Sequence, residues 1–218
     1  MTAEELRLRL IASVEAPTPS PAGAVPVVDP PGIAAQAGSD DASGLIDPPP
    51  IPAAVLVPFV LSAAPGVLLT KRNENLNNHA GQVSFPGGRI DPGDASPESA
   101  ALREAEEEIG LDPGRVEIAG RLEDYITGTG FRITPVLGLL PVGIDLAGLG
   151  LHVCAAEVES VFLLPLAVLL DPEAPQRKRA HFRGRWREFW VWPHSEHYIW
   201  GATAAILVHV AVRLRGVA

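Results

Sequence analysis

The stretch that decides the fold runs from Gly81 to Leu111 and reads GQVSFPGGRIDPGDASPESAALREAEEEIGL. It begins as a short apolar strand, turns at Pro86-Gly87-Gly88, continues as a loop and becomes one helix. Ser96 followed by Pro97 is a typical helix start, because serine caps free N–H groups and proline suits the first helical turn. Gly110 is the matching stop, since glycine readily adopts the left-handed conformation that ends helices.

The two faces of this helix differ in chemistry. Leu102, Ala105 and Ile109 recur at helical spacing and are expected to face a core. The opposite face carries carboxylates three and four residues apart, from Glu104, Glu107 and Glu108. Like charges at these spacings repel, and negative charge near a helix C-terminus opposes the helix dipole at about 0.3–1 kcal/mol each. A helix selected for stability alone would carry Lys or Arg there.

A bound cation would relieve this repulsion. Carboxylate oxygens on one helix face suit hard divalent ions such as Mg²⁺ or Mn²⁺. A solvated acidic face is the alternative interpretation, since such faces are common on surface helices. The glycine turn before the helix and Arg103 beside the carboxylates favour the metal site.

The same residues resemble the Nudix family. The run Arg103–Leu111 matches the second half of the Nudix box, Arg-Glu-apolar-any-Glu-Glu-any-Gly-apolar, at every defined position when Ala105 counts as apolar. In the first half, Asp94 stands where the family usually has Glu, and one extra residue separates it from Arg103. Both departures are similar to those of the coenzyme A pyrophosphatase branch. Two upstream runs also resemble that branch, Leu68–Asn73 and Gly81–Gly88.

The resemblance covers about Ala53 to Leu214. Within it, Asn77 stands where the branch signature expects a second Arg, and Asn73 replaces a usual Ser. The resemblance implies an α/β (α+β) protein with the Nudix fold, a mixed β-sheet sandwiched between α-helices. The order of expected elements agrees, since strands precede and follow one helix and an amphipathic helix ends the chain.

The activity that the resemblance implies is metal-dependent hydrolysis of a pyrophosphate bond. The implied substrate is coenzyme A or its acyl and oxidised forms, split to 3′,5′-ADP and a 4′-phosphopantetheine product. Another Nudix substrate, such as ADP-ribose, NADH or a nucleoside triphosphate, is the alternative within enzymes. A non-catalytic module that senses a nucleotide is the alternative of another class. The intact set of glutamates argues against a sensor, which would not need so many metal-binding carboxylates.

Candidate site residues follow from the box and its surroundings. The catalytic candidates are Glu107, Glu104, Arg103 and Glu157; the candidate ligands of Mg²⁺ or Mn²⁺ are Glu104, Glu108 and Glu107; the substrate-binding candidates are Gly87, Gly88 and Arg72. The glycines let the backbone approach a ligand closely. Arg103 can pair with Glu107 at a spacing of four residues, so it is expected to orient that carboxylate. Glu157 and a box glutamate both remain candidates for removing a proton from the attacking water.

Two of these candidates, Glu157 and Arg72, and one further residue, Trp200, have competing interpretations. In Nudix relatives a glutamate outside the box often binds metal or activates water, and Glu157 resembles it; the alternative is a solvent-facing residue at a strand start. Arg72 either contacts a substrate phosphate or closes a strand at the surface. Trp200 either shapes the substrate pocket or packs as a buried aromatic under the sheet.

Composition limits the class of protein. The chain has 218 residues and a formal net charge of −9 at pH 7, enough length for one sizeable domain. The negative charge argues against nucleic acid as a partner, because duplex binding uses basic surfaces. The single Cys154 excludes intrachain disulfides and is interpreted as a small buried hydrophobe. The N-terminal residues do not resemble a signal peptide and the longest apolar run is too short to span a membrane, so a cytoplasmic protein is expected.

The chain divides into three parts by composition. Residues 1–15 are predicted to form a helix with a capping box between Thr2 and Glu5. Residues 16–52 are rich in Pro, Ala and Gly and are predicted to be extended or mobile. Residues 53–218 are the expected Nudix domain. Its strands are predicted over Ala53–Leu61, Val67–Lys71, Val116–Tyr125, Phe131–Pro141 and Ala155–Leu163, and its last helix opens at Tyr198.

The one basic segment runs from Arg177 to Arg187 and holds six of the seventeen Lys and Arg residues, with Phe182 and Trp186 between them. A solvated hairpin whose Arg stems cover apolar surface is the first interpretation. Binding of the extra phosphate of coenzyme A comes next, and RNA binding last. The expected partner is a small nucleotide or coenzyme A substrate, and a homodimer is left open.

Overall fold

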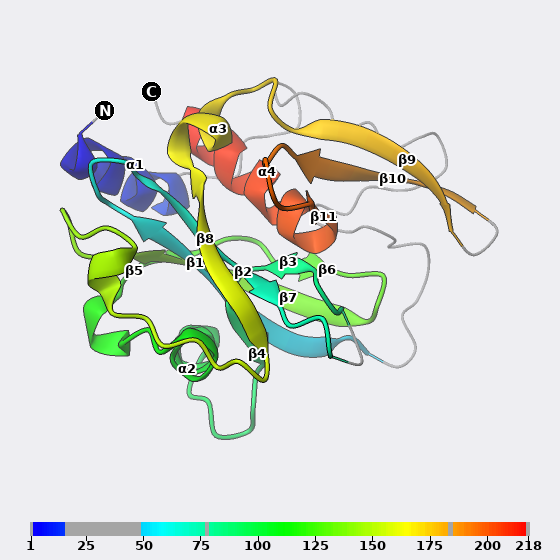
Figure 1. Ribbon diagram of the computed structural model, residues 1–218, viewed down its shortest axis with the longest axis horizontal. Coiled ribbons are helices and arrows are strands. Elements are labelled where there is room, and N and C mark those ends of the chain that lie inside the picture. The colour runs from blue at the N-terminus through cyan, green and yellow to red at the C-terminus, as the bar shows by residue number, and fades with distance from the viewer. Residues whose placement is uncertain (1, 16–48, 77–78, 183–184, 217–218) are drawn as a thin grey trace.

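The computed structural model describes residues 2–15, 49–76, 79–182 and 185–216. In this part of the chain a large mixed sheet lies between helices, and a smaller sheet projects beside it (Figure 1). The helices are α1 (Ala3–Glu15), α2 (Pro97–Ile109), α3 (Leu166–Leu170) and α4 (Gly201–Gly216). The strands of the large sheet are β1 (Ile51–Val60), β2 (Gly66–Arg72), β3 (Val83–Ser84), β4 (Gly87–Arg89), β5 (Glu117–Arg121), β6 (Tyr125–Ile126), β7 (Phe131–Leu139) and β8 (Val158–Pro165). The smaller sheet contains β9 (Gln176–Phe182), β10 (Arg185–Trp192) and β11 (Ile199–Trp200).

The large sheet is mixed because β1 and β7 run parallel from Ile51 beside Phe131 to Phe59 beside Leu139. Its main strand order is β3-β2-β1-β7-β5, while β4 pairs with β1, β6 with β7 and β8 with β2. The pairs other than β1–β7 are antiparallel. The Nudix-type expectation of a mixed sheet between helices is confirmed.

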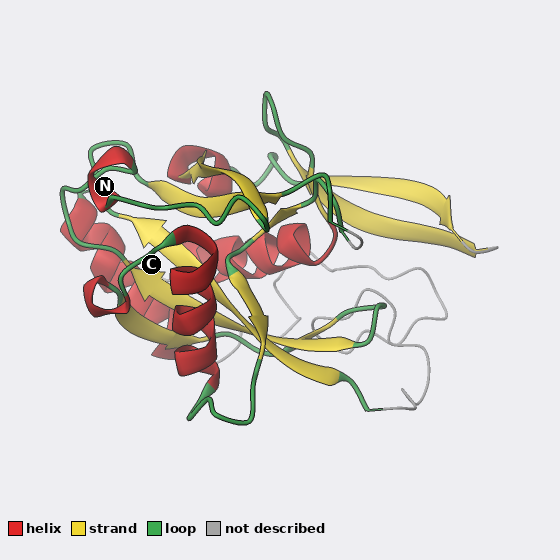
Figure 2. Cartoon of the chain, turned by 60° about the horizontal axis from the view of Figure 1, so that its bottom comes forward, coloured by secondary structure: helices red, strands yellow, loops and turns green. Residues whose placement is uncertain are grey.

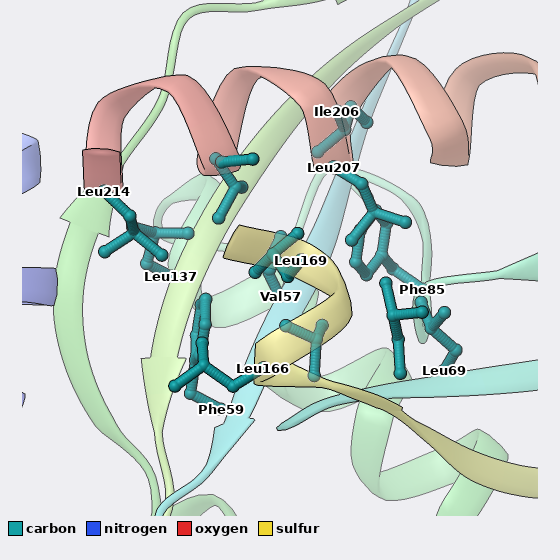
Figure 3. Close-up of a cluster of buried hydrophobic side chains, with 14 of the residues drawn as sticks. Val57, Phe59, Leu69, Phe85, Leu137, Leu166, Leu169, Ile206, Leu207 and Leu214 are labelled. Carbon is teal, nitrogen blue, oxygen red and sulfur yellow. The ribbon is translucent and has the colours of Figure 1, made fainter. Parts of the chain in front are cut away.

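The central strand β1 is apolar on both sides because both faces of the sheet are covered. Val57 and Phe59 face one core, which α1, α3 and α4 complete. Leu56 and Val60 face a second core, which α2 completes. Figure 3 shows the first core, where Leu214 of α4 lies beside Leu137 and Leu207 of α4 lies beside Phe85. Figure 2 shows helices on the two sides of the sheet.

The helix α2 begins and ends where the sequence predicts. The Ser96 hydroxyl accepts a hydrogen bond from the Ser99 N–H, and the Ser99 hydroxyl accepts one from the Ser96 N–H, so serine replaces the usual Glu of a capping box. Gly110 has φ 66° and ends the helix in the left-handed conformation. The capping box of α1 is confirmed too: the Thr2 N–H donates to Glu5 and the Glu5 N–H donates to the Thr2 hydroxyl.

Several boundaries differ from the predictions, because strand pairing sets where the strands begin and end. The strand predicted over Ala155–Leu163 runs from Val158 to Pro165 as β8, with residues 155–157 in a turn, and the strand predicted over Phe131–Pro141 ends at Leu139. Ile51 and Pro52 belong to β1 rather than to the preceding Pro-rich part, since they pair with β7. Residues 16–48 of that part lie outside the described chain. The predicted turn at Pro86-Gly87-Gly88 contains the start of β4, paired with β1 at Val55 and Ala54. The predicted strand Val116–Tyr125 divides into β5 and β6, and Ile199–Trp200 forms β11 before the last helix.

Within the described ranges, the helices are too short or too polar to cross a membrane.

The half-buried His209 of α4 makes the stability of this fold depend on pH. Burial lowers the pKa of His209 below its ordinary value of 6.5; Glu123 opposes the shift and Arg213 adds to it. As the pH falls, the unfolded chain therefore takes up this proton before the folded chain does, and the free energy of unfolding decreases below about pH 6.5.

We expect His209→Gln to make that decrease smaller, as measured by urea unfolding between about pH 7.5 and about pH 5.5. The matched control is His181→Gln, because His181 is exposed on the hairpin. A wild-type pH dependence in His209→Gln would contradict the interpretation.

Candidate active site

The helix α2 lies next to β4 (Figure 1). The predicted acidic face is on the last turns of this helix, where Glu108 contacts Gly87 of β4. Its three carboxylates differ in burial: the side chain of Glu108 is 3% exposed, that of Glu104 18% and that of Glu107 62%. Helical spacing places them on one face, but only the first two lie against the sheet side of the helix. Glu107 is the carboxylate that faces solvent.

Glu108 is held where α2 meets β4. The backbone N–H of Gly87 donates to its Oε2 at 3.1 Å, and Nη1 of Arg72 lies 3.5 Å from its Oε1. Burial raises the pKa of Glu108 to about 7, opposed by Gly87 and Arg72 and assisted by the charges of Glu157 and Glu104. The sequence predicts Gly87 and Arg72 as substrate contacts; in the structure both contact this carboxylate.

Glu104 fills the space that Gly88 leaves open. A Cβ atom at Gly88 would lie 2.5 Å from the carboxylate carbon of Glu104, so a side chain there would displace it. Burial raises the pKa of Glu104, and the charges of Glu107 and Glu157 add to this rise while Arg103 opposes it. The second glycine of the predicted turn thus leaves room for the Glu104 carboxylate in its present position.

Arg103 makes its principal contacts elsewhere than expected. Its Nε and Nη2 donate to the two carboxylate oxygens of Asp94 at 3.1 and 2.9 Å, and its Nη1 donates to Glu104 at 2.8 Å. The expected contact with Glu107 is longer, at 3.4 Å. Arg103 therefore links Asp94 to Glu104 by short hydrogen bonds, and its contact with Glu107 is the weaker one.

Asp94 is the residue whose role the sequence interpretation missed. It was visible there only as the residue that replaces the usual Glu of the box. In the structure it accepts both hydrogen bonds from Arg103 and a third from the Asp91 N–H, at 2.8 Å. Arg103 is the principal cause that lowers the pKa of Asp94. Asp94 differs from the Glu that is usual at this position, but it still provides a carboxylate that anchors Arg103.

Glu157 lies in the turn before β8 and is exposed. It is near enough that its charge helps raise the pKa of both Glu104 and Glu108. The turn is attached to α2, since the Cys154 N–H donates to the backbone oxygen of Glu108 at 2.9 Å. The structure thus brings Glu157 beside the box residues, although it comes from a distant part of the sequence. Cys154 itself is partly exposed, which makes its interpretation as a buried hydrophobe wrong.

The side chains as they stand do not form a preassembled metal cage. Within the described ranges, no three His, Cys, Asp or Glu side chains are close enough to hold a metal ion together. The donor set nevertheless fits a hard cation: Glu104 and Glu108 are largely buried, their pKa values are raised, and neighbouring carboxylates contribute to both shifts. A divalent ion would offset this concentration of negative charge.

The basic hairpin formed by β9 and β10 uses its described cations internally. Arg177 lies 4.4 Å from the ring centre of Trp190, and Arg179 lies 5.6 Å from that of Trp186 and 3.3 Å from Glu188. This arrangement supports the interpretation as a solvated hairpin. Trp200 is 39% exposed, so the expectation that it packs as a buried aromatic is wrong. Asn77 lies outside the described residues.

A hollow of about 420 Å³ lies elsewhere on the molecule, lined by residues that include Arg7, Arg115, Glu117 and Pro141. It shares no lining residue with the candidate site. Its cations are already paired, since Arg7 binds Glu117 and Arg115 donates to the Leu149 backbone oxygen. Nothing in this hollow suggests chemistry.

Comparison with known proteins agrees with the box. Residues 50–190 match the family described as NUDIX domain. The "Uncharacterized Nudix hydrolase NudL" of Cronobacter sakazakii is 42% identical over 162 residues, which cover 74% of this chain and 82% of the relative. The protein of the same description from Escherichia coli (strain K12) is 40% identical over the same length and coverage.

Solved structures overlap with parts of the chain. The MutT/nudix family protein from Enterococcus faecalis has a TM-score of 0.49 and 15% identity, covering 77% of this chain and 68% of that one. The NUDIX domain of Shewanella oneidensis NrtR, complexed with ADP ribose, has a TM-score of 0.41 and 23% identity, covering 54% and 74%. The family match over more than half of the chain, together with relatives at 40% identity or above, shows that this protein belongs to the Nudix hydrolase family.

Proposed function

We propose that the protein is a divalent-metal-dependent hydrolase of the pyrophosphate bond in coenzyme A or its acyl and oxidised forms, with 3′,5′-ADP and a 4′-phosphopantetheine product. The observation that carries this proposal is the buried carboxylate of Glu108, held by the Gly87 N–H beside Glu104 and within reach of the Glu157 charge. The choice of coenzyme A rests on the runs Leu68–Asn73 and Gly81–Gly88, which resemble the signature of that branch.

Glu104, Glu107 and Glu108 would hold Mg²⁺ or Mn²⁺. When bound, the cation supplies positive charge that neutralises the diphosphate and acidifies a water molecule. The protein contributes rigidity: the Gly87 N–H fixes Glu108, while Arg103, anchored by Asp94, fixes Glu104. Glu107, the most exposed of the three, would be the carboxylate that adjusts when substrate enters.

Arg72 supports the proposal from the substrate side. Its Nε is buried and lacks a hydrogen-bond partner among the residues that the structure describes. Its contact with Glu108 is also long, at 3.5 Å. A buried donor of this kind is costly unless a ligand satisfies it, and a phosphate oxygen suits guanidinium geometry. We therefore assign Arg72 to a phosphate of the substrate.

The proton acceptor is proposed to be Glu157. Its carboxylate is exposed, whereas Glu108 is buried and Glu104 is bound to Arg103. An exposed carboxylate beside the site can take a proton from water and pass it to solvent. In this assignment, the box glutamates bind the cation and the glutamate outside the box handles the proton.

Substitution of the box carboxylates tests the metal site. We expect Glu107→Gln and Glu108→Gln each to lower kcat/KM for coenzyme A by at least about 100-fold. Loss of a residue that only supports a metal ligand costs up to about 100-fold, and loss of a ligand itself should cost at least as much. Glu106→Gln is the matched control, because Glu106 is exposed on the same helix and occupies an undefined box position. The measurement is steady-state hydrolysis with Mg²⁺, accompanied by thermal unfolding. Full activity in both Glu107→Gln and Glu108→Gln would remove the metal-site assignment.

A methyl group at Gly88 should have a similar effect by displacing Glu104. We expect Gly88→Ala to weaken both Mn²⁺ binding, measured by calorimetry without substrate, and hydrolysis of coenzyme A. Gly93→Ala is the control, because Gly93 lies in the loop that follows β4 and a Cβ atom there meets nothing within 4 Å. Unchanged Mn²⁺ affinity in Gly88→Ala would show that the position of Glu104 does not matter for the cation.

A substrate panel tests the second half of the proposal. We expect kcat/KM to be highest for coenzyme A and acyl-coenzyme A among a set that includes 3′-dephospho-coenzyme A, ADP-ribose, NADH and nucleoside triphosphates. Mg²⁺ and Mn²⁺ are each supplied, with a chelator as the blank. A clear preference for ADP-ribose or NADH would reject the coenzyme A assignment while leaving pyrophosphate hydrolysis in place.

A further inference from the structure

We propose that Asn73 is a positioning residue that fixes Glu157 beside the box carboxylates. This inference rests on the proposed function, because the role of Glu157 belongs to it. Asn73 is the first residue after β2, and it follows directly on Arg72. It lies more than eighty positions before Glu157, so local sequence gives no sign of the connection.

Asn73 binds the turn that carries Glu157 at two points. Its backbone N–H donates to the backbone oxygen of Glu157 at 2.8 Å. Its side-chain Nδ2 donates to the backbone oxygen of Ala155 at 2.6 Å. One residue therefore satisfies two carbonyl groups in a three-residue stretch, which restricts that stretch more than a single contact would.

The other side of the turn is attached to α2. The Cys154 N–H donates to the backbone oxygen of Glu108, and the Cys154 oxygen accepts from the N–H groups of Glu157 and Val158, each at 2.9 Å. Two residues upstream, the His152 N–H donates to the Ile109 oxygen at 2.9 Å. The turn is thus held between the end of the metal-binding helix and Asn73.

The orientation of Asn73 is itself fixed. Its Oδ1 accepts from the backbone N–H of Asn75 at 2.8 Å and from the Asn75 side chain at 3.0 Å. This is a turn in which an asparagine side chain binds the backbone two residues ahead. Because Oδ1 is occupied on that side, the Nδ2 group is directed to Ala155.

The sheet register separates Glu157 from the other nearby glutamate. Lys71 pairs with Ser160 and Arg72 pairs with Val158, so Glu159 is an extra residue in β8. Glu159 binds Lys71 at 2.9 Å. Such bulges commonly re-aim side chains next to functional sites. The bulge leaves Glu159 in a surface ion pair, whereas Glu157 stays in the turn held by Asn73, where its charge acts on Glu104 and Glu108.

The chemical consequence concerns alignment. A base that must take a proton from water has to keep its carboxylate within hydrogen-bond reach, and a displacement of about 1 Å can cost about 100-fold in rate. Glu157 is exposed and therefore gains little restriction from side-chain packing. Its backbone anchors, of which Asn73 supplies one directly and one through Ala155, are what hold it.

The test is a kinetic double-mutant cycle with wild type, Asn73→Ala, Glu157→Gln and the double variant on coenzyme A with Mg²⁺. We expect Asn73→Ala to lower kcat by about 10-fold or more, within the range that misalignment can cost, with little change in KM. The double variant should be no slower than Glu157→Gln alone, because misplacing a carboxylate that is already absent has no further effect. Asn75→Ala is the matched control, since the bonds from Asn73 to Ala155 and Glu157 remain, and its kcat should stay near wild type.

A second readout uses no substrate. The Mn²⁺ dissociation constant, measured by calorimetry, should stay near the wild-type value in Asn73→Ala, because the box glutamates bind the cation and Glu157 handles the proton. A large loss of Mn²⁺ affinity in Asn73→Ala would contradict the inference, because Asn73 would then act on the metal site. Asn73→Asp keeps the acceptor for Asn75 and removes the donor to Ala155, and it replaces Asn73→Ala in both measurements where the alanine variant does not fold.

Two outcomes would overturn the inference alone while wild-type hydrolysis persists: wild-type kcat in the Asn73 variant, and losses that multiply in the double variant. Wild-type kcat in Glu157→Gln would overturn the inference together with the proposed role of Glu157 as proton acceptor. Multiplied losses would mean that Asn73 acts through the general stability of the loop or on another group. Absence of metal-dependent hydrolysis of any pyrophosphate substrate by the wild type would instead overturn the proposed function, and this inference with it.

Discussion

The structure of the site depends on the burial of one carboxylate. Glu108 is 3% exposed and receives a hydrogen bond from the Gly87 N–H, so it joins α2 to β4. Burial of a carboxylate without full compensation is unfavourable, which the rise of its pKa to about 7 expresses. The other residues of the site lie around Glu108. Arg72 approaches it from β2, and Glu104 lies against Gly88. Arg103, which is anchored by Asp94, binds Glu104. A site that concentrates negative charge in this way is suited to a divalent cation.

Much of this site could be predicted from residues that are close to one another in the sequence. The start and end of α2 were predictable, because Ser96, Pro97 and Gly110 act on their own neighbours. The helical spacing of Glu104, Glu107 and Glu108 was legible for the same reason. The family followed from the box, and with it the mixed sheet, which spacing of strands alone could not have distinguished from other layered folds.

What could not be predicted depends on contacts between distant segments. The glycine stretch becomes β4 only because β1 lies beside it, and Pro52 enters β1 because β7 pairs with it. The same limit applies to Arg103, whose nearest partners are Asp94 and Glu104 rather than the residue four positions ahead. Glu104 is largely buried by the sheet and Glu107 is exposed, and helical periodicity alone does not reveal this difference. The turn that carries Glu157 is likewise fixed by Asn73 and by the end of α2, neither of which is its neighbour in sequence.

The central claim is that the box carboxylates bind the catalytic cation beside the Gly87-Gly88 backbone. The most direct measurement is a crystal structure of the full chain grown with Mn²⁺, with the anomalous scattering of manganese used to locate the ion. The account predicts a manganese peak bound by oxygen atoms of Glu104, Glu107 and Glu108. A peak bound elsewhere, or a site that stays without manganese at millimolar concentration while these carboxylates keep their present contacts, would contradict it.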